Sequence, residues 1–284
     1  MTNQARLQFT YGATTATASS NIASTIIQGP LTANKTLLES AYQADGALTY
    51  MVQLTNSGAG ALTPVTLVGD LGTYEVSPGL NVTPLTYTGP AQLFLNGVYS
   101  ASLTPALEPG KVTFTIPSLA PGVNAMLIYK ARVNEYALLT APSAITNTVS
   151  VDAPTMMDPV SVSHTVPVAD YADVTITKSM TPNPITDGST LTSTFLIQNF
   201  GNTAASSVVL TDAFTPSPDP ITVTVDGVTL PGTDYDYTGG VLTLPNAGSA
   251  YSLTIPAASF IQDPATGEVT INPGSVTITV AGVI

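Results

Sequence analysis

The sequence predicts an all-β protein built from tandem β-sandwiches, and three observations lead to this prediction. Apolar and β-branched residues alternate over short segments, and no segment shows a convincing helical period. Twenty-three prolines and 22 glycines interrupt these segments, as expected for many short strands joined by turns. A length of 284 residues allows about two domains, each with its own hydrophobic core.

Charged side chains are scarce, and this scarcity limits the possible functions. Asp, Glu, Lys and Arg make up 8% of the residues, against roughly a quarter in an average soluble protein. The net charge of −12, with only six Lys and Arg, argues against nucleic-acid binding, because that affinity depends on neutralising phosphates. The absence of cysteine excludes disulfide bonds and thiolate metal sites. We predict no cofactor and no metal ion.

The chain contains two copies of one strand pattern. Residues 31–72 parallel residues 174–214, because each segment gives a strand, an Asp-Gly turn, a long alternating strand and a second turn. Both halves then carry a hairpin signal and a strand ending in Ile-Pro, at Asn96-Gly97 and 111–117 and at Asp226-Gly227 and 251–256. The copies predict two immunoglobulin-like Greek-key sandwiches: domain 1 over residues 23–155, and a linker strand with domain 2 over residues 156–284.

The second copy lacks its last strands. The first copy continues through 124–133 to strands at 144–151 and 160–168, whereas the second ends at 274–284, the counterpart of 124–133. An incomplete sandwich exposes an unpaired edge and part of its core. Residues 1–9 and 16–27 resemble the missing strands, and we expect residues 1–22 to form a donor-strand arm that completes domain 2 of a neighbouring copy.

Polar residues recur at positions that strand alternation directs toward the core. The first set is Lys35, Asp70 and Asn147, and the second is Lys178, Asp212 and Asn3, the last on an arm face with Met1, Ala5, Leu7 and Phe9. Asp70 fits the alternation less well than Asp212. Lys and Asp are almost never buried without a partner, so each set is expected to form one site.

Two interpretations of these sites remain open. One is a buried hydrogen-bonded Lys–Asp pair with an Asn neighbour, which fixes the register of the strands. The other is an autocatalytic isopeptide bond, in which a neutral lysine amine attacks the Asn carboxamide while the acid shuttles protons. Lys35 would then join Asn147 within a chain, Lys178 would join Asn3 between chains, and Asp70 and Asp212 would be the proton shuttles.

Residues 176–214 and 144–151 resemble the bacterial conserved-repeat domain of unknown function eleven, an immunoglobulin-like module of surface proteins. The Lys, Asp and Asn arrangement is also similar to that of Gram-positive pilins and collagen-adhesin domains. That resemblance implies a bond from a first-strand Lys to a last-strand Asn beside a buried acid. The chain departs from sortase-assembled pilins, since we find no signal peptide, sorting motif or membrane anchor in it.

These observations predict a structural subunit of a self-assembling extracellular filament, pilus-like or spore-appendage-like. Its partners would be copies of itself joined head to tail, and it would not be an enzyme beyond forming its own isopeptide bonds. No run of 18 apolar residues predicts a membrane span, and we expect the protein at the cell or spore surface by a route other than a standard signal peptide. The alternative is a surface adhesin or carbohydrate-binding module.

Overall fold

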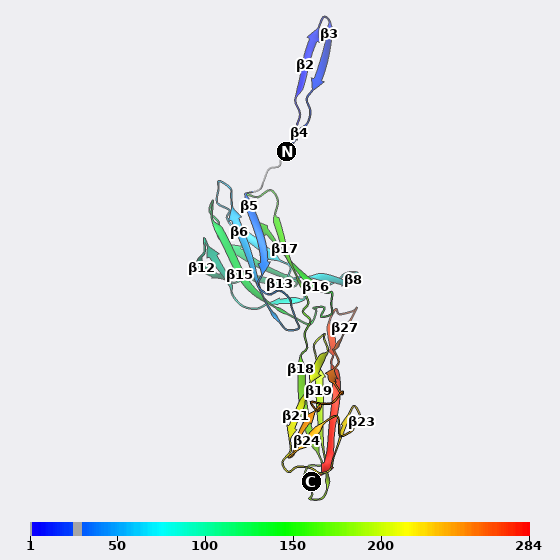
Figure 1. Cartoon of the computed structure of the whole chain (residues 1–284). Coiled ribbons are helices and arrows are strands. Elements are labelled where there is room, and N and C mark those ends of the chain that lie inside the picture. Colours follow the sequence, from blue (N-terminus) through cyan, green and yellow to red (C-terminus); the bar gives the residue numbers. More distant parts are fainter. Residues whose placement is uncertain (1, 25–29) are drawn as a thin grey trace.

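A computed structural model describes residues 2–24 and 30–284. Within these residues the chain forms strands and turns and no helix, which confirms the all-β prediction. Figure 1 shows two sandwiches that follow one another along the chain. No helix in the described ranges is long and apolar enough to cross a membrane.

Domain 1 is a sandwich of two antiparallel sheets. In the order of pairing, the first sheet contains β12 (Val98–Leu103), β11 (Ala91–Leu95), β15 (Asn124–Val133), β6 (Ala47–Asn56) and β5 (Leu31–Leu37), with β10 (Leu85–Tyr87) also on β15. The second contains β13 (Ala106–Glu108), β14 (Lys111–Ile116), β7 (Val65–Gly69), β16 (Ala144–Asp152) and β17 (Val160–Pro167). A small hairpin of β8 (Tyr74–Ser77) and β9 (Leu80–Val82) extends from one end.

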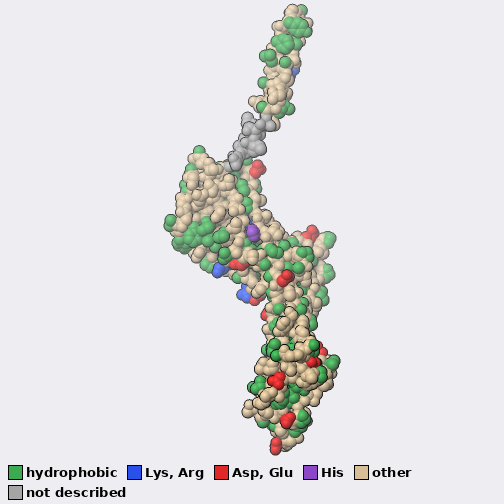
Figure 2. Space-filling view, in the orientation of Figure 1, with side chains coloured by type: hydrophobic (Ala, Val, Ile, Leu, Met, Phe, Trp, Pro, Cys, Tyr) green, Lys and Arg blue, Asp and Glu red, His purple; other side chains and the backbone are tan. Residues whose placement is uncertain are grey.

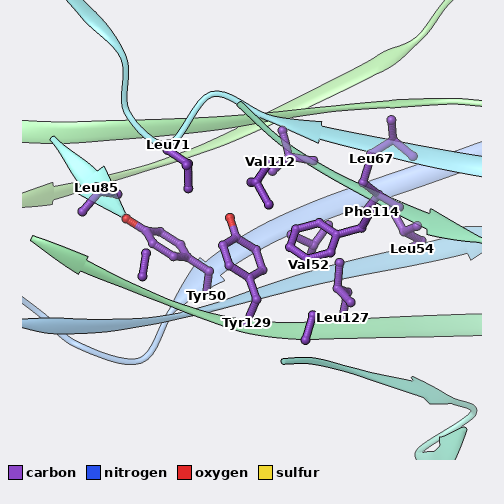
Figure 3. Close-up of a cluster of buried hydrophobic side chains, with 14 of the residues drawn as sticks. Tyr50, Val52, Leu54, Leu67, Leu71, Leu85, Val112, Phe114, Leu127 and Tyr129 are labelled. Carbon is purple, nitrogen blue, oxygen red and sulfur yellow. The ribbon is translucent and has the colours of Figure 1, made fainter. Parts of the chain in front are cut away.

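Aromatic rings fill the space between the two sheets of domain 1. Tyr50 on β6 lies opposite Tyr129 on β15, and their ring centroids are 5.4 Å apart. Phe114 from the other sheet lies 5.2 Å from the ring of Tyr129, and Figure 3 shows these rings surrounded by buried aliphatic side chains. The alternating burial of β6 and β15 therefore produces the continuous core that the sequence pattern predicts.

Both predicted hairpins form. Asn96 and Gly97 have φ values of 48° and 81°, and Asp226 and Gly227 have values of 49° and 79°. Such paired left-handed residues match the right-handed twist of the flanking strands, which is why Asn-Gly and Asp-Gly mark two-residue hairpins. The two turns join β11 to β12, and β22 (Ile221–Val225) to β23 (Val228–Thr229).

Domain 2 has one complete sheet and a fragmentary second layer. The sheet contains β18 (Val174–Thr181), β19 (Thr190–Asn199), β29 (Gly274–Val283), β22 and β23. The other layer contains β21 (Leu210–Ala213), β25 (Val241–Leu244) and β24 (Asp236–Thr238), with a separate pair of β20 (Ala205–Val208) and β26 (Leu253–Ile255). A hairpin of β27 (Ser259–Gln262) and β28 (Val269–Asn272) precedes β29.

The order of strands shows which neighbour β21 is without among the described residues. In domain 1 the second sheet runs β13-β14-β7-β16-β17, and in domain 2 the matching order β24-β25-β21 stops there. The layer continues from β21 into β20, where Ala205 pairs with Ile255 and Val208 with Leu253 of β26. The counterpart of the strand at 111–117 is therefore divided between β25 and β26. The predicted match with 251–256 holds for the end of that strand, and β25 is the part that pairs with β21.

The boundary between the domains also needs a correction. The sequence placed residues from 156 onward in the second domain, with a linker strand. That strand is β17, which pairs with β16 along its whole length, and its Val166 is buried in the core of domain 1. The apolar alternation of β17 fits either assignment, and only the pairing decides between them.

The N-terminal arm is itself a β-hairpin. Its strands are β1 (Thr2–Asn3), β2 (Arg6–Tyr11), β3 (Thr14–Ser19) and β4 (Ala23–Ser24). β1 pairs with β4, and β2 pairs with β3 around a turn at Gly12. The arm thus has the same strand–turn–strand form as β16 and β17.

Candidate functional site

Lys35 lies between the sheets of domain 1 with 3% of its surface exposed. Its Nζ donates a hydrogen bond of 2.7 Å to the backbone oxygen of Asn147 and lies 4.7 Å from the centre of the Tyr50 ring. Burial lowers the pKa of Lys35 to about 7, and the negative charge of Asp70 opposes this shift only in part. A large fraction of the amine is therefore neutral near pH 7, the form that can act as a nucleophile.

Asn147, on β16, brings its side-chain amide into the same part of the core. It is fully buried, and its Nδ2 donates a long hydrogen bond of 3.5 Å to the hydroxyl of Tyr129. Its Oδ1 is buried without a hydrogen-bond partner among the described residues. A buried carbonyl oxygen without a donor is costly, so this amide is poorly satisfied beside a partly neutral amine.

Two tyrosines that sequence reasoning did not select complete this site. Burial raises the pKa of Tyr50 to about 12 and raises the pKa of Tyr129 further in the same direction. Both hydroxyls therefore stay protonated and can donate a hydrogen bond to an oxygen that gains negative charge. The alternating pattern of β6 and β15 directs both side chains inward, and that signal could have identified them.

Asp70 occupies a different position from the one expected. Its Oδ1 accepts hydrogen bonds from the backbone N–H groups of Gly72, at 2.8 Å, and Thr148, at 2.9 Å. The inward position of β7 belongs to Gly69, which pairs with Val112. Asp70 follows it and holds β16 in place through backbone bonds, while its charge still acts on Lys35.

Lys178 and Asp212 in domain 2 contact each other directly. The Lys178 Nζ lies 2.6 Å from Asp212 Oδ2, and their side chains are 34% and 18% exposed. The same Nζ lies 5.2 Å from the ring of Phe195 and 5.0 Å from that of Phe214. Asp212 pairs with Leu242 as Gly69 pairs with Val112, so Asp212 is the counterpart of Gly69 and not of Asp70.

An apolar surface surrounds this ion pair. Every residue of β18 is exposed, and the exposed fractions on the face of Lys178 are 43% for Val174, 53% for Ile176 and 54% for Met180. Ser193 lies on β19 at the position that Tyr50 holds on β6, and its buried Oγ has no partner within the described residues. We call β18 and the Lys178–Asp212 pair the acceptor surface.

The arm presents a matching apolar face. Leu7 and Phe9 on β2 lie opposite Ala18 and Ala16 on β3, so these side chains share one side of the hairpin. Leu7 is 64% exposed, Phe9 44% and Tyr11 63%. Ala5 is also exposed, and Asn3 is exposed and pairs with Ala23. Met1, predicted on the same face, lies outside the described residues.

One chain thus brings together Lys35 and Asn147 but leaves Lys178 without an asparagine beside it in the described structure. Asn3, the asparagine predicted to join Lys178, lies on the arm. Residues 2–24 and 30–284 contain no group of three His, Asp or Glu side chains that could hold a metal ion. His164 lies on β17 opposite Asn147.

Comparisons with known proteins find distant structural likeness only. No family model matches the chain, so membership of the conserved-repeat family is not shown, and no curated protein matches it. One similar solved structure is BcpA, the major pilin subunit of Bacillus cereus, at 13% identity over 93% of this chain and 75% of that chain, with a TM-score of 0.38. A second is the pilus backbone RrgB from Streptococcus pneumoniae, at 10% identity over 86% of this chain and 92% of that chain, with a TM-score of 0.35. A third is the T6 backbone pilin of Streptococcus pyogenes, at 8% identity over 84% of this chain and 67% of that chain, with a TM-score of 0.35.

Proposed function

We propose that this protein is the subunit of an extracellular homopolymeric filament, in which the arm of each chain completes domain 2 of the next. The observation that carries this proposal is a match between two parts of the chain. Domain 2 has no counterpart of β16 and β17 among the described residues, and the arm is a free hairpin with one apolar face. Strand addition satisfies an exposed edge with backbone hydrogen bonds, and side-chain pockets then set the register.

The donated hairpin would take the place that β16 and β17 occupy in domain 1. In domain 1, β16 pairs with β7 and β17 lies against β5. Equivalent pairing puts β2 along the free edge of β21 and β3 against β18. Leu7 and Phe9 would then cover the acceptor surface. This contact is between different surfaces of two copies, and such a head-to-tail contact extends as a filament where the rotation between copies does not close a ring.

The low charge of the surface favours such an assembly. Figure 2 shows few charged side chains on the visible face of the molecule. With 8% charged residues, copies can approach closely with little desolvation of ionised groups. The net charge of −12 still keeps separate filaments apart over the range of the Debye length.

The same register would place Asn3 beside Lys178 and Asp212 and allow a covalent bond between chains. Covering the site disfavours the charged pair, so a proton passes from Lys178 to Asp212. The neutral amine attacks the side-chain carbonyl carbon of Asn3, and Asp212 transfers the proton from the attacking to the leaving nitrogen. The bond from carbon to the amide nitrogen breaks, ammonia leaves, and a Lys178–Asn3 isopeptide bond remains.

A bond within domain 1 between Lys35 and Asn147 belongs to the same proposal. The buried amine with its lowered pKa and the poorly satisfied amide support it. Asp70 would shuttle protons here, from a position where its Oδ1 already accepts two backbone N–H groups. We therefore expect this bond to form more slowly than the bond between chains.

Boiling the purified full chain in SDS tests the proposal. We expect a ladder of covalent oligomers on the gel and filaments in electron micrographs. Deleting residues 1–22 should abolish both, whereas Asn3→Ala should abolish the ladder and keep filaments that SDS dissociates. Asn147→Ala is the matched control, because it removes the asparagine of the proposed bond within domain 1 and should leave the ladder intact.

Two results would contradict the proposal. A wild-type chain that stays monomeric in native size measurements at high concentration excludes polymerisation through the arm. Filaments that survive deletion of residues 1–22 exclude the arm as the donor. Intact mass separates the two bonds, since the deletion chain should still lose one ammonia if Lys35 joins Asn147.

A further inference from the structure

The hairpin of β27 and β28 extends from domain 2 onto domain 1. Phe260 on β27 and Ile271 on β28 lie opposite each other and pack against the hydrophobic core of domain 1. At the tip, Gly267 is buried, and a Cβ atom at this position would lie 2.5 Å from the Cγ1 of Val82. The hairpin therefore sits in a close-fitting apolar contact.

Polar contacts fix the same hairpin in one orientation. The backbone N–H of Val269 donates to the carbonyl of Glu135 at 2.7 Å, and Gln262 Nε2 donates to the hydroxyl of Tyr74 at 2.6 Å. The β8–β9 hairpin of domain 1 contributes Tyr74 and also Ser77, whose Oγ donates to the carbonyl of Pro264 at 3.2 Å. Bonds from both backbone and side chains make this a specific interface.

A second contact between the domains lies beside β19. Asn202 donates from its Nδ2 to the carbonyls of Leu139, at 2.8 Å, and Ala169, at 2.7 Å. Its Oδ1 accepts the backbone N–H of Tyr171 at 2.9 Å. This amide therefore uses both donors and its acceptor at the junction, close to the end of β19 at Asn199.

These contacts hold strands at the centre of the incomplete domain. β28 ends at Asn272 and β29 begins at Gly274. β29 is the middle strand of the complete sheet, paired with β19 on one side and β22 on the other. In domain 1 the matching connection, residues 117–123 between β14 and β15, is a short loop with no hairpin.

We infer that domain 1 acts as a built-in chaperone that keeps the incomplete domain 2 folded until it receives a donor hairpin. The inference rests on the proposed function, because only a domain that waits for a donor needs such support. A sheet with one uncovered face loses apolar burial, the main driving force of folding. Packing Phe260 and Ile271 into the core of domain 1 replaces part of that burial.

Hydrogen exchange of a full chain that cannot donate its arm tests this inference. Leu7→Asp with Phe9→Asp gives the blocked chain, and Phe260→Ala with Ile271→Ala then removes the contact. We expect amides of β29 and β19 to exchange about tenfold faster or more, because opening of domain 2 is no longer coupled to domain 1, while β6 and β15 keep their protection. Ile261→Ala is the matched control, since Ile261 lies on the same hairpin and is 60% exposed. Unchanged exchange in β29 would overturn the inference.

Binding of a synthetic peptide of residues 2–24 separates this inference from the proposed function. The blocked chain should bind the peptide, and the blocked chain with Phe260→Ala and Ile271→Ala should bind it at least tenfold more weakly. Equal binding by both chains overturns the chaperone role and supports strand donation. No binding by either chain contradicts strand donation, and the exchange experiment alone then decides whether domain 1 stabilises domain 2.

Discussion

β5 in domain 1 and β18 in domain 2 have the same sequence pattern and opposite environments. Each strand directs three apolar side chains and one lysine to the same face. Leu31 is 4% exposed, whereas its counterpart Val174 is 43% exposed, and Lys35 is buried where Lys178 is half-exposed. The difference comes from β16 and β17, which cover β5 and have no counterpart over β18 in the described chain. Burial of a strand thus depends on its neighbours as much as on its own residues.

The acids near the two lysines differ in a second way. Asp212 faces its lysine at 2.6 Å, while Asp70 lies one residue further along its strand and accepts backbone N–H groups. The pair in domain 2 is partly exposed to solvent. In domain 1, burial has already lowered the pKa of the amine. In the filament proposed above, domain 2 of a separate chain would be in the state that precedes covering of Lys178.

The largest effect should follow from giving domain 2 its own donor. Moving residues 2–24 to a position after Ile284, through a linker of ten residues, copies the connection of residues 134–143 between β15 and β16. Domain 2 then becomes as complete as domain 1, and the acceptor surface is filled within the chain. We expect a monomer with no filaments, measured by light scattering and electron microscopy. Filaments from this rearranged chain would show that polymerisation uses another surface.

The next largest effect is on the rate of oligomer formation, when the acid near each lysine is replaced. Asp212→Asn removes the carboxylate beside Lys178 and should slow formation of SDS-resistant oligomers by about 10²–10⁴-fold, the usual contribution of a general acid or base. Asp70→Asn keeps an oxygen that can accept backbone N–H groups and should leave the oligomer ladder unchanged. Quantitative gels over time measure both rates. Equal rates in wild type and Asp212→Asn would exclude Asp212 as the proton shuttle.

Matched truncations on the two strands should differ in stability. Leu31→Ala removes a buried side chain and should lower the free energy of unfolding of domain 1 by about 2–5 kcal/mol. Val174→Ala, in the chain with Leu7→Asp and Phe9→Asp, should change the free energy of unfolding of domain 2 by no more than about 0.5 kcal/mol, because Val174 is exposed. Urea denaturation gives both values. In filaments, Val174→Ala should lower the free energy of unfolding more than it does in the blocked chain, because the donated hairpin would cover Val174.

The smallest effect is the pH dependence of the free energy of unfolding of domain 1. Burial lowers the pKa of Lys35 to about 7 from 10.5, so between these pH values the unfolded chain binds more protons than the folded chain. The free energy of unfolding should therefore rise with pH across this window, by about 1–2 kcal/mol once relaxation and water access are allowed for. The measurement needs Asn147→Ala, so that Lys35 keeps its free amine.

Lys35→Met in the same background supplies the control for this pH effect. The methionine has no proton to bind, and the rise between pH 7 and 10.5 should disappear. Lys178→Met, which removes the half-exposed lysine of domain 2, should leave the rise unchanged. A rise that persists in Lys35→Met would mean that another group titrates in this window.

Features that depend on local pattern could be predicted from the order of the residues. Alternation predicted the strands, and Asn96-Gly97 and Asp226-Gly227 predicted their hairpins, because left-handed turn residues and side-chain direction are properties of neighbouring residues. The matching strand patterns of residues 31–72 and 174–214 revealed the repeat.

Features that depend on pairing between distant strands became visible only in the folded chain. It assigned β17 to domain 1 and divided the counterpart of β14 between β25 and β26. It also showed that Asp212 corresponds to Gly69 and not to Asp70. A shift of one residue turns a strand side chain to the other face, and sequence spacing alone does not fix register between strands. The burial that lowers the pKa of Lys35 arises in the same way, from β16 laid across β5 by the closing of the sandwich.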